Sequence, residues 1–206
     1  MKVVTAKELS TESLEGVRRI FEDAFDARLR SSFDNLLADQ VYVLLDGDEP
    51  QGFAVLRVLG PTSWIFLRYY AVGRRGRGLG SRFWRLLTQR LAEEGHTRII
   101  WDVEHPAEPG AEDVEIRERR IVFYTRLGGN VLPVRDFRWP DGDTSLPMVL
   151  MAAELRPTSE LASPAEPSPP VVGEDLRQVV MAVYRYRYGF DEQDPVVQST
   201  LAASGL

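Results

Sequence analysis

The spacing of apolar residues along the chain predicts helices and strands in alternation. Apolar side chains three or four residues apart indicate amphipathic helices, and short β-branched or aromatic runs bounded by glycine or proline indicate strands. The predicted strands are Val3–Ala6, Val41–Leu45, Gly52–Leu59, Trp64–Val72, Arg98–Glu104, Val131–Val134 and Met148–Leu155. The predicted helices are Ser10–Phe25, Ser31–Ala38, Ser81–Glu94, Glu112–Leu127 and Glu174–Tyr188, with Val196–Leu206 either a short helix or a frayed end.

The order of these segments predicts a mixed α/β fold rather than a doubly wound sheet. Three successive strands between residues 41 and 72 are joined by short turns, so we expect them to be antiparallel. Arg98–Glu104 follows a helix, which predicts a right-handed crossover and a parallel pairing with Trp64–Val72. The segment between Val134 and Met148, which contains two prolines and a glycine, is predicted to be a loop.

The distribution of prolines divides the chain into three parts. Residues 1–155 are predicted to form one domain, residues 156–173 a proline-rich linker, and residues 174–206 a C-terminal helical extension. The apolar face of the extension is expected to pack on its own domain or on a second copy of the chain, which leaves a homodimer open. The alternative is that it covers the functional site.

Composition excludes several classes of protein. The 206 residues include no cysteine and two histidines, which argues against disulfides, a thiol nucleophile and a structural zinc site. The N-terminus is too polar for a signal peptide, and no apolar run approaches the roughly 18 residues of a membrane span. The net charge of −6 argues against nucleic acid as a partner. We therefore expect a cytoplasmic protein with no membrane and no nucleic-acid contact.

A glycine-rich turn carries the strongest chemical signal. Arg75-Gly76-Arg77-Gly78-Leu79-Gly80 lies between the strand Trp64–Val72 and a predicted helix, with Arg74, Arg82 and Arg85 close by. Glycines allow positive φ and close approach of a ligand, and a helix N-terminus favours an anion. The spacing fits neither a P-loop nor Gly-x-Gly-x-x-Gly. The alternative is an ordinary glycine-rich connection, but a basic island on an acidic chain favours a small polyanionic ligand.

Two motifs together resemble the GNAT N-acetyltransferase superfamily. The first is Arg75-x-x-Gly78-x-Gly80, and the second is Phe123-Tyr124-Thr125-Arg126-Leu127-Gly128. The resemblance covers residues 64–129 by motif and extends to about residue 155 by element order. Here only Gly73 and Arg74 separate the last valine of the strand from the motif arginine, which is shorter than the family pattern. The implied fold is a central, mostly antiparallel sheet flanked by helices, in which the parallel strands Trp64–Val72 and Arg98–Glu104 splay apart.

The resemblance implies acetyl-CoA as the acyl donor, with coenzyme A held at the glycine-rich turn. The residues implied for the pyrophosphate are Arg75, Gly76, Arg77, Gly78, Leu79, Gly80 and Ser81. Those implied for the pantetheine arm are Tyr70, Ala71 and Val72. The implied partner is a small-molecule or peptide amine that accepts the acyl group, and no metal is implied.

Two side chains are candidates for catalysis. By resemblance Tyr124 is the donor to the departing thiolate; the alternative is a core aromatic beside Phe123. Glu104 ends its strand and is a candidate base for the amine; the alternative is a solvated carboxylate. Asp102 lies on the same strand face and is a further acidic candidate, whereas His105 is a weaker one.

The resemblance implies an acetyl-CoA-dependent N-acetyltransferase, and the acidic residues of the strand Arg98–Glu104 suit an amine that attacks directly in a ternary complex. The chain has no cysteine and no Gly-x-Ser-x-Gly elbow, so no acyl-enzyme is expected. The alternatives are a non-catalytic acyl-CoA-binding regulatory module and a nucleotide-phosphate binder. Arg68 lies inside an apolar strand and is expected to find a carboxylate on a neighbouring strand.

Overall fold

The described residues form two compact units. The computed structural model describes the chain apart from residues 26–31, 75, 77, 109–112, 142–143 and 157–170. Unit 1 contains Met1–Arg57 and Leu67–Gly95, and unit 2 contains Val58–Phe66, His96–Leu155 and residues 171–206. Most of the linker predicted at 156–173 therefore lies outside the described residues, and the predicted three-part division stays a prediction.

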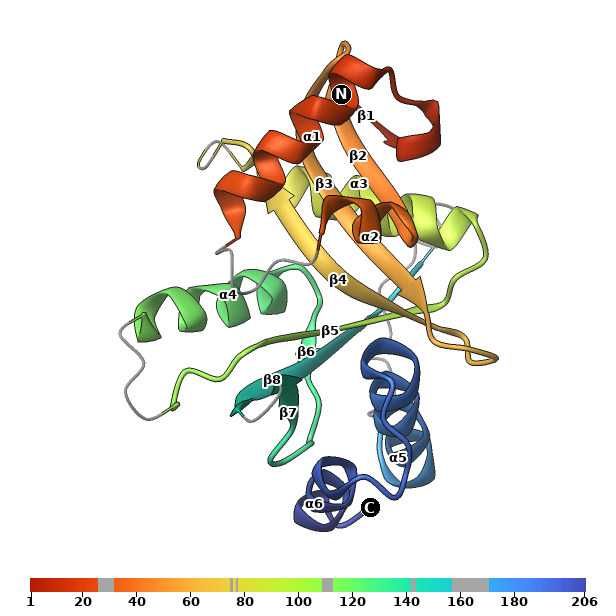
Figure 1. The fold of residues 1–206 in the computed structure, drawn as a ribbon, viewed down its shortest axis with the longest axis vertical. Helices are drawn as coiled ribbons and strands as arrows, with labels where there is room; N and C mark the ends of the chain where they lie inside the picture. Colours follow the sequence, from red (N-terminus) through yellow and green to blue (C-terminus); the bar gives the residue numbers. More distant parts are fainter. Residues whose placement is uncertain (26–31, 75, 77, 109–112, 142–143, 157–170) are drawn as a thin grey trace. The chain divides into compact units, whose positions relative to one another are not determined.

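Unit 1 is an antiparallel sheet with helices on both faces. In Figure 1, α1 and α2 cover one face of the strands and α3 lies behind them. β1 pairs antiparallel with β2, and β2 pairs antiparallel with β3. Its elements are β1 (Lys2–Thr5), the 3₁₀ turn η1 (Ala6–Glu8), α1 (Thr11–Ala24), α2 (Phe33–Leu37), β2 (Gln40–Asp46), β3 (Glu49–Val58), β4 (Trp64–Val72) and α3 (Leu79–Glu93).

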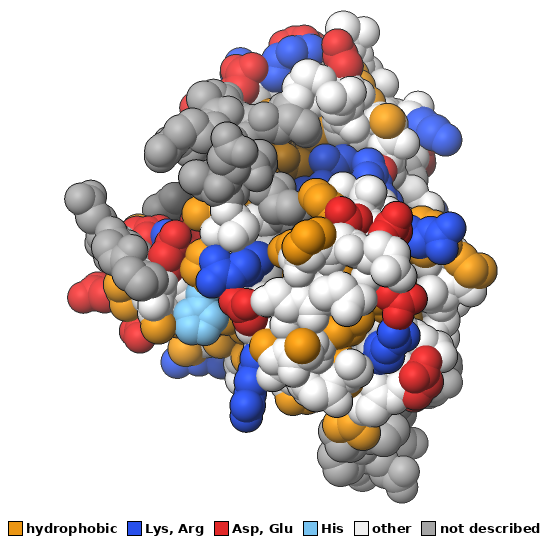
Figure 2. Space-filling model, turned by 60° about the horizontal axis from the view of Figure 1, so that its bottom comes forward, with side chains coloured by type: hydrophobic (Ala, Val, Ile, Leu, Met, Phe, Trp, Pro, Cys, Tyr) orange, Lys and Arg blue, Asp and Glu red, His pale blue; other side chains and the backbone are white. Residues whose placement is uncertain are grey.

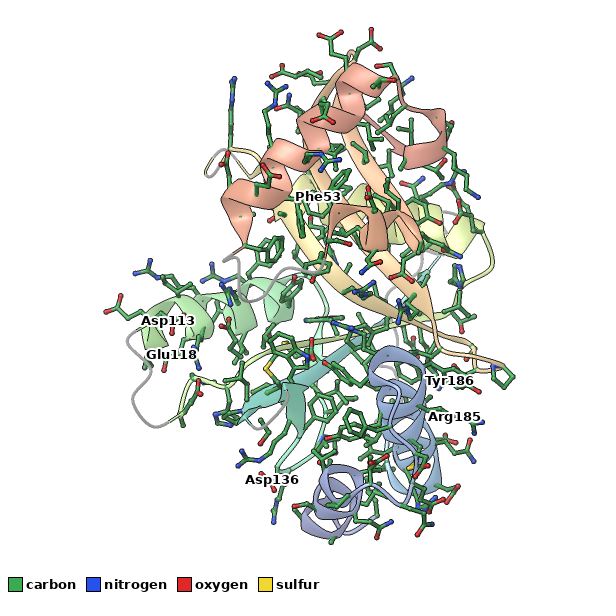
Figure 3. The ribbon with its side chains drawn as sticks, viewed as in Figure 1. Phe53, Asp113, Glu118, Asp136, Arg185 and Tyr186 are labelled. Atoms are coloured by element: carbon green, nitrogen blue, oxygen red, sulfur yellow. The ribbon has the colours of Figure 1, made fainter. Side chains whose placement is uncertain are left out.

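The core of unit 1 lies between α1 and the sheet. The Ser10 side chain caps α1 by accepting a hydrogen bond from the Ser13 amide at 3.2 Å. Phe21 of α1 packs edge-on against Phe53 of β3, with ring centroids 6.0 Å apart. Phe53 is fully buried, and Figure 3 shows it between α1 and the strands. Apolar residues at helical spacing therefore meet alternate residues of the strands, as the sequence pattern requires.

Unit 2 is built around the long strand β8. β8 pairs antiparallel with β5 over the length of β5, and it also pairs with the short strands β6 and β7. The first three residues of β4, Trp64–Phe66, pair parallel with the first three of β5. The remaining elements are β5 (Arg98–Glu104), α4 (Val114–Arg126), β6 (Asn130–Val131), β7 (Arg138–Asp141), β8 (Thr144–Glu154), α5 (Gly173–Ala182), the π-helical segment η4 (Val183–Tyr188) and α6 (Pro195–Ser204).

The C-terminal helices complete the core of unit 2. Strand residues such as Phe66, Ile100 and Leu150 share one buried cluster with residues of α5, η4 and α6. The hydroxyls of Tyr184 and Thr200 lie 2.8 Å apart inside this cluster, which joins η4 to α6. The extension therefore packs on its own chain within this unit.

The mixed α/β class and the parallel pairing of β4 with β5 are confirmed. The strand order is β1-β2-β3-β4-β5-β8-β6, with β7 on β8. The loop predicted between Val134 and Met148 is wrong, because β7 and the start of β8 form a hairpin there. Pro140 misled the prediction: it lies in the short strand β7, off the path of the main sheet, where a missing N–H is tolerated. The strand predicted at Val131–Val134 is two residues long and begins at Asn130.

Arg68 has the carboxylate partner that its position required. Asp39, one residue before β2, forms ion pairs with Arg68 and with Arg57, the latter at 2.8 Å. The side chains of Asp39 and Arg68 are 8% and 7% exposed. Burial raises the pKa of Asp39, but hydrogen bonds from Arg57 and Arg68 outweigh it and lower the pKa below its ordinary value. The cluster holds the start of β2 against β3 and β4.

Removing the Asp39 carboxylate should destabilise unit 1. We expect Asp39→Ala to lower the free energy of unfolding at pH 7 by about 3–5 kcal/mol, because Arg68 stays charged and buried. The exposed Asp34, replaced by alanine, should cost less than about 1 kcal/mol. Chemical denaturation measures both.

This loss should also depend on pH. The lowered pKa means that the carboxylate stabilises the fold at neutral pH, and that this contribution disappears as pH falls below about 4. The wild-type and Asp39→Ala unfolding energies should therefore converge in acid. A difference that stays constant down to the acid transition would contradict the assignment.

Candidate functional site

The turn between β4 and α3 has the backbone that its glycines predict. Gly76 and Gly78 have φ of 88° and 69°, and Gly78 is the N-cap of α3. A Cβ added at either glycine would meet no described atom within 4 Å, so no described side chain fills the space beside them. Arg75 and Arg77, both predicted to bind the cofactor, lie outside the described residues.

The first turn of α3 is suited to a negatively charged ligand. Its opening amides have no carbonyl one turn earlier in the helix to bond with, and the helix dipole makes this end positive. The first bond of the regular ladder runs from the Arg82 amide to the Gly78 carbonyl at 3.0 Å. The first turn of α3 carries no acidic residue. The Leu79 amide donates to the Gly76 carbonyl at 3.5 Å. Gly80 and Ser81 are therefore the positions in this turn whose backbone amides can hold a phosphate.

Tyr70 fastens this turn to the sheet. Its hydroxyl donates a hydrogen bond of 2.6 Å to the Gly80 carbonyl. Its ring stacks on Phe83 at 5.1 Å between centroids and meets Trp84 edge-on at 5.7 Å. The side chain of Tyr70 thus positions the helix N-terminus, which the sequence did not reveal.

The end of β4 offers backbone groups on one edge. A Cβ added at Gly52 of β3 would lie 2.7 Å from the Ala71 carbonyl oxygen, and the Gly73 amide donates to the Gln51 carbonyl at 2.9 Å. Ala71 therefore turns its backbone polar groups toward β3. Successive residues of a strand present these groups to alternate edges, so Tyr70 and Val72 present theirs to the edge away from β3. Pantetheine contact by these residues stays a prediction.

Tyr124 lies in unit 2, in the last turn of α4. It is 8% exposed, and its ring lies 4.8 Å from that of Trp101. Burial raises the pKa of Tyr124 well above 10, with the charge of Asp102 adding to it and that of Arg120 opposing it. The side chain is therefore both a core aromatic and a hydroxyl that stays protonated at physiological pH.

Glu104 is surrounded by guanidinium groups. One carboxylate oxygen accepts a hydrogen bond from Arg120, and the other lies 4.0 Å from Arg117. Arg117 is 9% exposed and also binds Glu108, Asp113 and the His105 carbonyl. This network joins α4 to the end of β5. The predicted role of Glu104 as a base stays a prediction, and its ion pairs favour a role in positioning.

Asp102 has different surroundings. It lies in β5, half-buried, and its carboxylate accepts a hydrogen bond from the hydroxyl of Tyr188 in η4. Asp102 was a candidate from its strand position, whereas Tyr188 was missed. No signal in the sequence links residue 188 to residue 102.

The structure adds three observations, on surface charge, metal ligands and membrane-spanning helices. Acidic and basic side chains are interspersed over the face shown in Figure 2. Within the described ranges no cluster of three metal-ligating side chains occurs, and no helix there has both the length and the apolar character to span a bilayer.

Comparisons with known proteins identify a matching family. A family model described as Acetyltransferase (GNAT) family matches residues 10–115, just over half of the chain. Among curated proteins, none matches the sequence significantly.

Several solved structures share the fold. A Bacteroides thetaiotaomicron protein described as a GNAT-family acetyltransferase has a TM-score of 0.66 and 20% identity, covering 93% of this chain and 100% of its own. An aminoglycoside 6'-N-acetyltransferase complexed with coenzyme A has a TM-score of 0.55 and 18% identity, covering 76% and 98%. The ribosomal-protein-S18-alanine N-acetyltransferase from Escherichia coli has a TM-score of 0.50 and 19% identity, covering 82% and 97%. At these identities the likeness concerns the fold.

Loss of the Tyr70 hydroxyl should weaken coenzyme A binding. Tyr70→Phe keeps the ring between β4 and α3 but removes the bond to Gly80, worth about 0.5–1.5 kcal/mol. We expect the Kd for coenzyme A, measured by calorimetry, to rise by about 2- to 10-fold. The matched control is Tyr69→Phe, whose ring packs against Phe21 and Phe25 instead. An equal rise in both variants would contradict a specific role for Tyr70.

Proposed function

The chain belongs to the GNAT acetyltransferase family, and we propose that it is an acetyl-CoA-dependent N-acetyltransferase acting on an amine. The observation that carries this proposal is the open turn at Gly76 and Gly78, followed by a helix whose first turn lacks acidic residues. A packed connection between strand and helix would fill the space beside these glycines. The open turn instead suits a diphosphate.

Coenzyme A is proposed to bind unit 1 through two sets of residues. The turn and the first residues of α3 hold the pyrophosphate, and the edge of β4 away from β3 holds the pantetheine arm. The proposed residues are Tyr70, Ala71, Val72, Arg75, Gly76, Arg77, Gly78, Leu79, Gly80 and Ser81. Acetyl-CoA, when bound, supplies the activated acetyl group.

The chemistry requires one proton to leave the amine and one to reach the sulfur. A lysine-like amine has a pKa near ~10.4, so about 1 molecule in 2,500 is nucleophilic at pH 7, a penalty of roughly 4.6 kcal/mol. A thiol ionises near ~8.5, so the leaving group needs less assistance. A protonated Tyr124 can stabilise the developing thiolate by donating a hydrogen bond. The base is an acidic side chain of β5, and Glu104 is the residue that the sequence predicts.

Direct attack in a ternary complex is the mechanism that the residues favour. The chain contains no cysteine and no Gly-x-Ser-x-Gly elbow that would carry an acyl group. The acceptor is proposed to be an amine of a small molecule or a peptide. The structural neighbours named for an aminoglycoside and for a ribosomal-protein alanine represent these two kinds.

A non-catalytic acyl-CoA-binding module is the second candidate. Two observations favour it: Glu104 is engaged by arginines, and the ring of Tyr124 is part of the core. Such a module would bind coenzyme A as tightly as an enzyme does, yet would transfer acetyl to no amine.

Replacing Tyr124 distinguishes the two candidates. In an enzyme, Tyr124→Phe should lower kcat by about 10²- to 10³-fold, because the thiolate loses its donor. The KM for acetyl-CoA should change little, since the turn before α3 is intact. The measurement is acetyl-CoA turnover against a panel of amines.

The buried ring is retained in Tyr124→Phe, so the melting temperature serves as the control for folding. Equal turnover by wild type and variant would remove Tyr124 from the mechanism. Tight binding of coenzyme A without turnover of any amine would favour the non-catalytic module.

A further inference from the structure

Asp102 and Tyr188 form a hydrogen-bonded pair between β5 and the C-terminal segment. The Tyr188 hydroxyl donates to the Asp102 carboxylate, and the Tyr188 ring packs edge-on to Phe66 with centroids 6.4 Å apart. In the described part of the chain Asp102 forms no ion pair. Its register partner on β8 is the uncharged Leu150. Burial of a carboxylate that has no ion pair costs free energy.

The charged and titratable groups around Asp102 come from three elements. Arg187 of η4 lies over the rings of Phe66 and Tyr188, with its guanidinium carbon 5.8 Å and 4.8 Å from their centroids. Its Nε is buried and has no hydrogen-bond partner among the described residues. Tyr124 of α4 is near enough for the charge of Asp102 to act on it. Glu104 is two residues further along β5.

These surroundings make Asp102 a stronger base than an ordinary aspartate. Burial raises the pKa of Asp102, and the hydrogen bond from Tyr188 and the charge of Arg187 oppose this only in part. A carboxylate is most effective as a base when its pKa approaches the working pH. Burial and the charge of Asp102 raise the pKa of Tyr188 well above 10, so its hydroxyl remains a donor.

We propose that Asp102 is the general base for the acceptor amine, and that Tyr188 is the positioning residue that holds its carboxylate. This inference rests on the proposed acetyltransferase function and assigns a role to the C-terminal segment. The carboxylates of β5 differ in one decisive respect. Each oxygen of Glu104 faces a guanidinium, whereas among the described residues the Asp102 carboxylate is bonded by the neutral Tyr188 hydroxyl and its own backbone amide, and forms no ion pair.

The proton balance of the proposed reaction is consistent with Asp102 as the base. Asp102 accepts one proton from the acceptor ammonium, and the freed nitrogen lone pair forms the C–N bond to the acetyl carbon. The C–S bond then breaks, and its electron pair leaves with the sulfur. Tyr124 stabilises that sulfur by donating a hydrogen bond, and the second proton of the nitrogen passes to the thiolate. Asp102 then releases its proton to solvent.

The position of Tyr188 is fixed by the fold of the tail. η4 is a π-helical turn, a rare form that is found frequently at functional sites. It ends at Gly189, whose φ of 80° reverses the chain directly after Tyr188. Tyr184, one turn earlier, is fully buried and bonded to Thr200 of α6. The helices of the extension therefore hold the tyrosine hydroxyl at β5.

The test compares four variants of the full chain: Asp102→Asn, Glu104→Gln, Tyr188→Phe and Tyr186→Phe. Tyr186 is in the same π-helical turn (Figure 3), and its ring lies against Gly60. The measurements are coenzyme A binding, kcat/KM for an amine across pH, and NMR titration of ¹³C-labelled aspartate carboxyls. The Asp102 signal is the one missing from the Asp102→Asn spectrum.

The expected results differ for each residue. Asp102→Asn should bind coenzyme A normally but lose about 10²- to 10⁴-fold in kcat/KM, together with the acidic limb of the pH profile. Tyr188→Phe should move both that limb and the Asp102 titration to higher pH, because the carboxylate loses its donor. Tyr186→Phe should match wild type in both. Glu104→Gln should keep the acidic limb.

Each contrary result overturns a named part of the proposal. An active wild type with an equally active Asp102→Asn overturns the base role and leaves the acetyltransferase assignment intact. An acidic limb that disappears in Glu104→Gln instead assigns the base to Glu104. An unshifted limb and titration in Tyr188→Phe overturn the positioning role, even if Asp102→Asn fails to fold. A wild type that acetylates no amine overturns the proposed function and the base role with it.

Discussion

The hydrogen bond from the Tyr70 hydroxyl to the Gly80 carbonyl is the contact on which the proposed coenzyme A site of unit 1 depends. The favourable field of a helix N-terminus extends over about one turn, so its position relative to a ligand must be fixed closely. Tyr70 fixes it by joining the end of β4 to the first turn of α3, while Phe83 and Trp84 hold the ring in place. The glycines can then keep their left-handed backbone and an open space beside it, because the strand and the helix on either side are already fastened together.

The parts of the candidate site that depend on residues close together in the chain could be predicted from the sequence. The strand, the glycine turn and the helix follow directly from the spacing of apolar residues around Arg75–Gly80. The partners of Tyr70 and of Arg68 could not be named, because they depend on how α3 and Asp39 pack on the sheet. The hairpin at residues 138–154 was missed for a different reason: Pro140 is tolerated in β7, and sequence alone does not show which strands lie at an edge.

In the C-terminal extension, the spacing of apolar residues predicts the helices but not the contacts that their polar side chains make. Leu176, Val180 and Val183 follow helical spacing, and all three are buried against the strands of unit 2. In a regular α-helix, the side chains of Tyr184, Tyr186 and Tyr188 would point to different sides. A π-helical turn changes the direction of each side chain, and a single tyrosine then reaches β5. The extension therefore supplies both core packing and a polar group, and only the packing has a signature in the sequence.

The two acidic residues of β5 can divide their tasks because they differ in electrostatic surroundings. Glu104 is bonded to Arg120, which lies four residues before Tyr124 and so on the same face of α4. That ion pair fixes α4 on β5 and thereby positions the Tyr124 hydroxyl. The same pair engages the Glu104 lone pairs, which are then less available to an ammonium proton. Among the described residues Asp102 forms no ion pair, and burial raises its pKa, so its carboxylate binds a proton more readily than an ordinary aspartate does. A site that needs one carboxylate to hold a helix and another to accept a proton is served by placing arginines around the first and a neutral hydroxyl on the second.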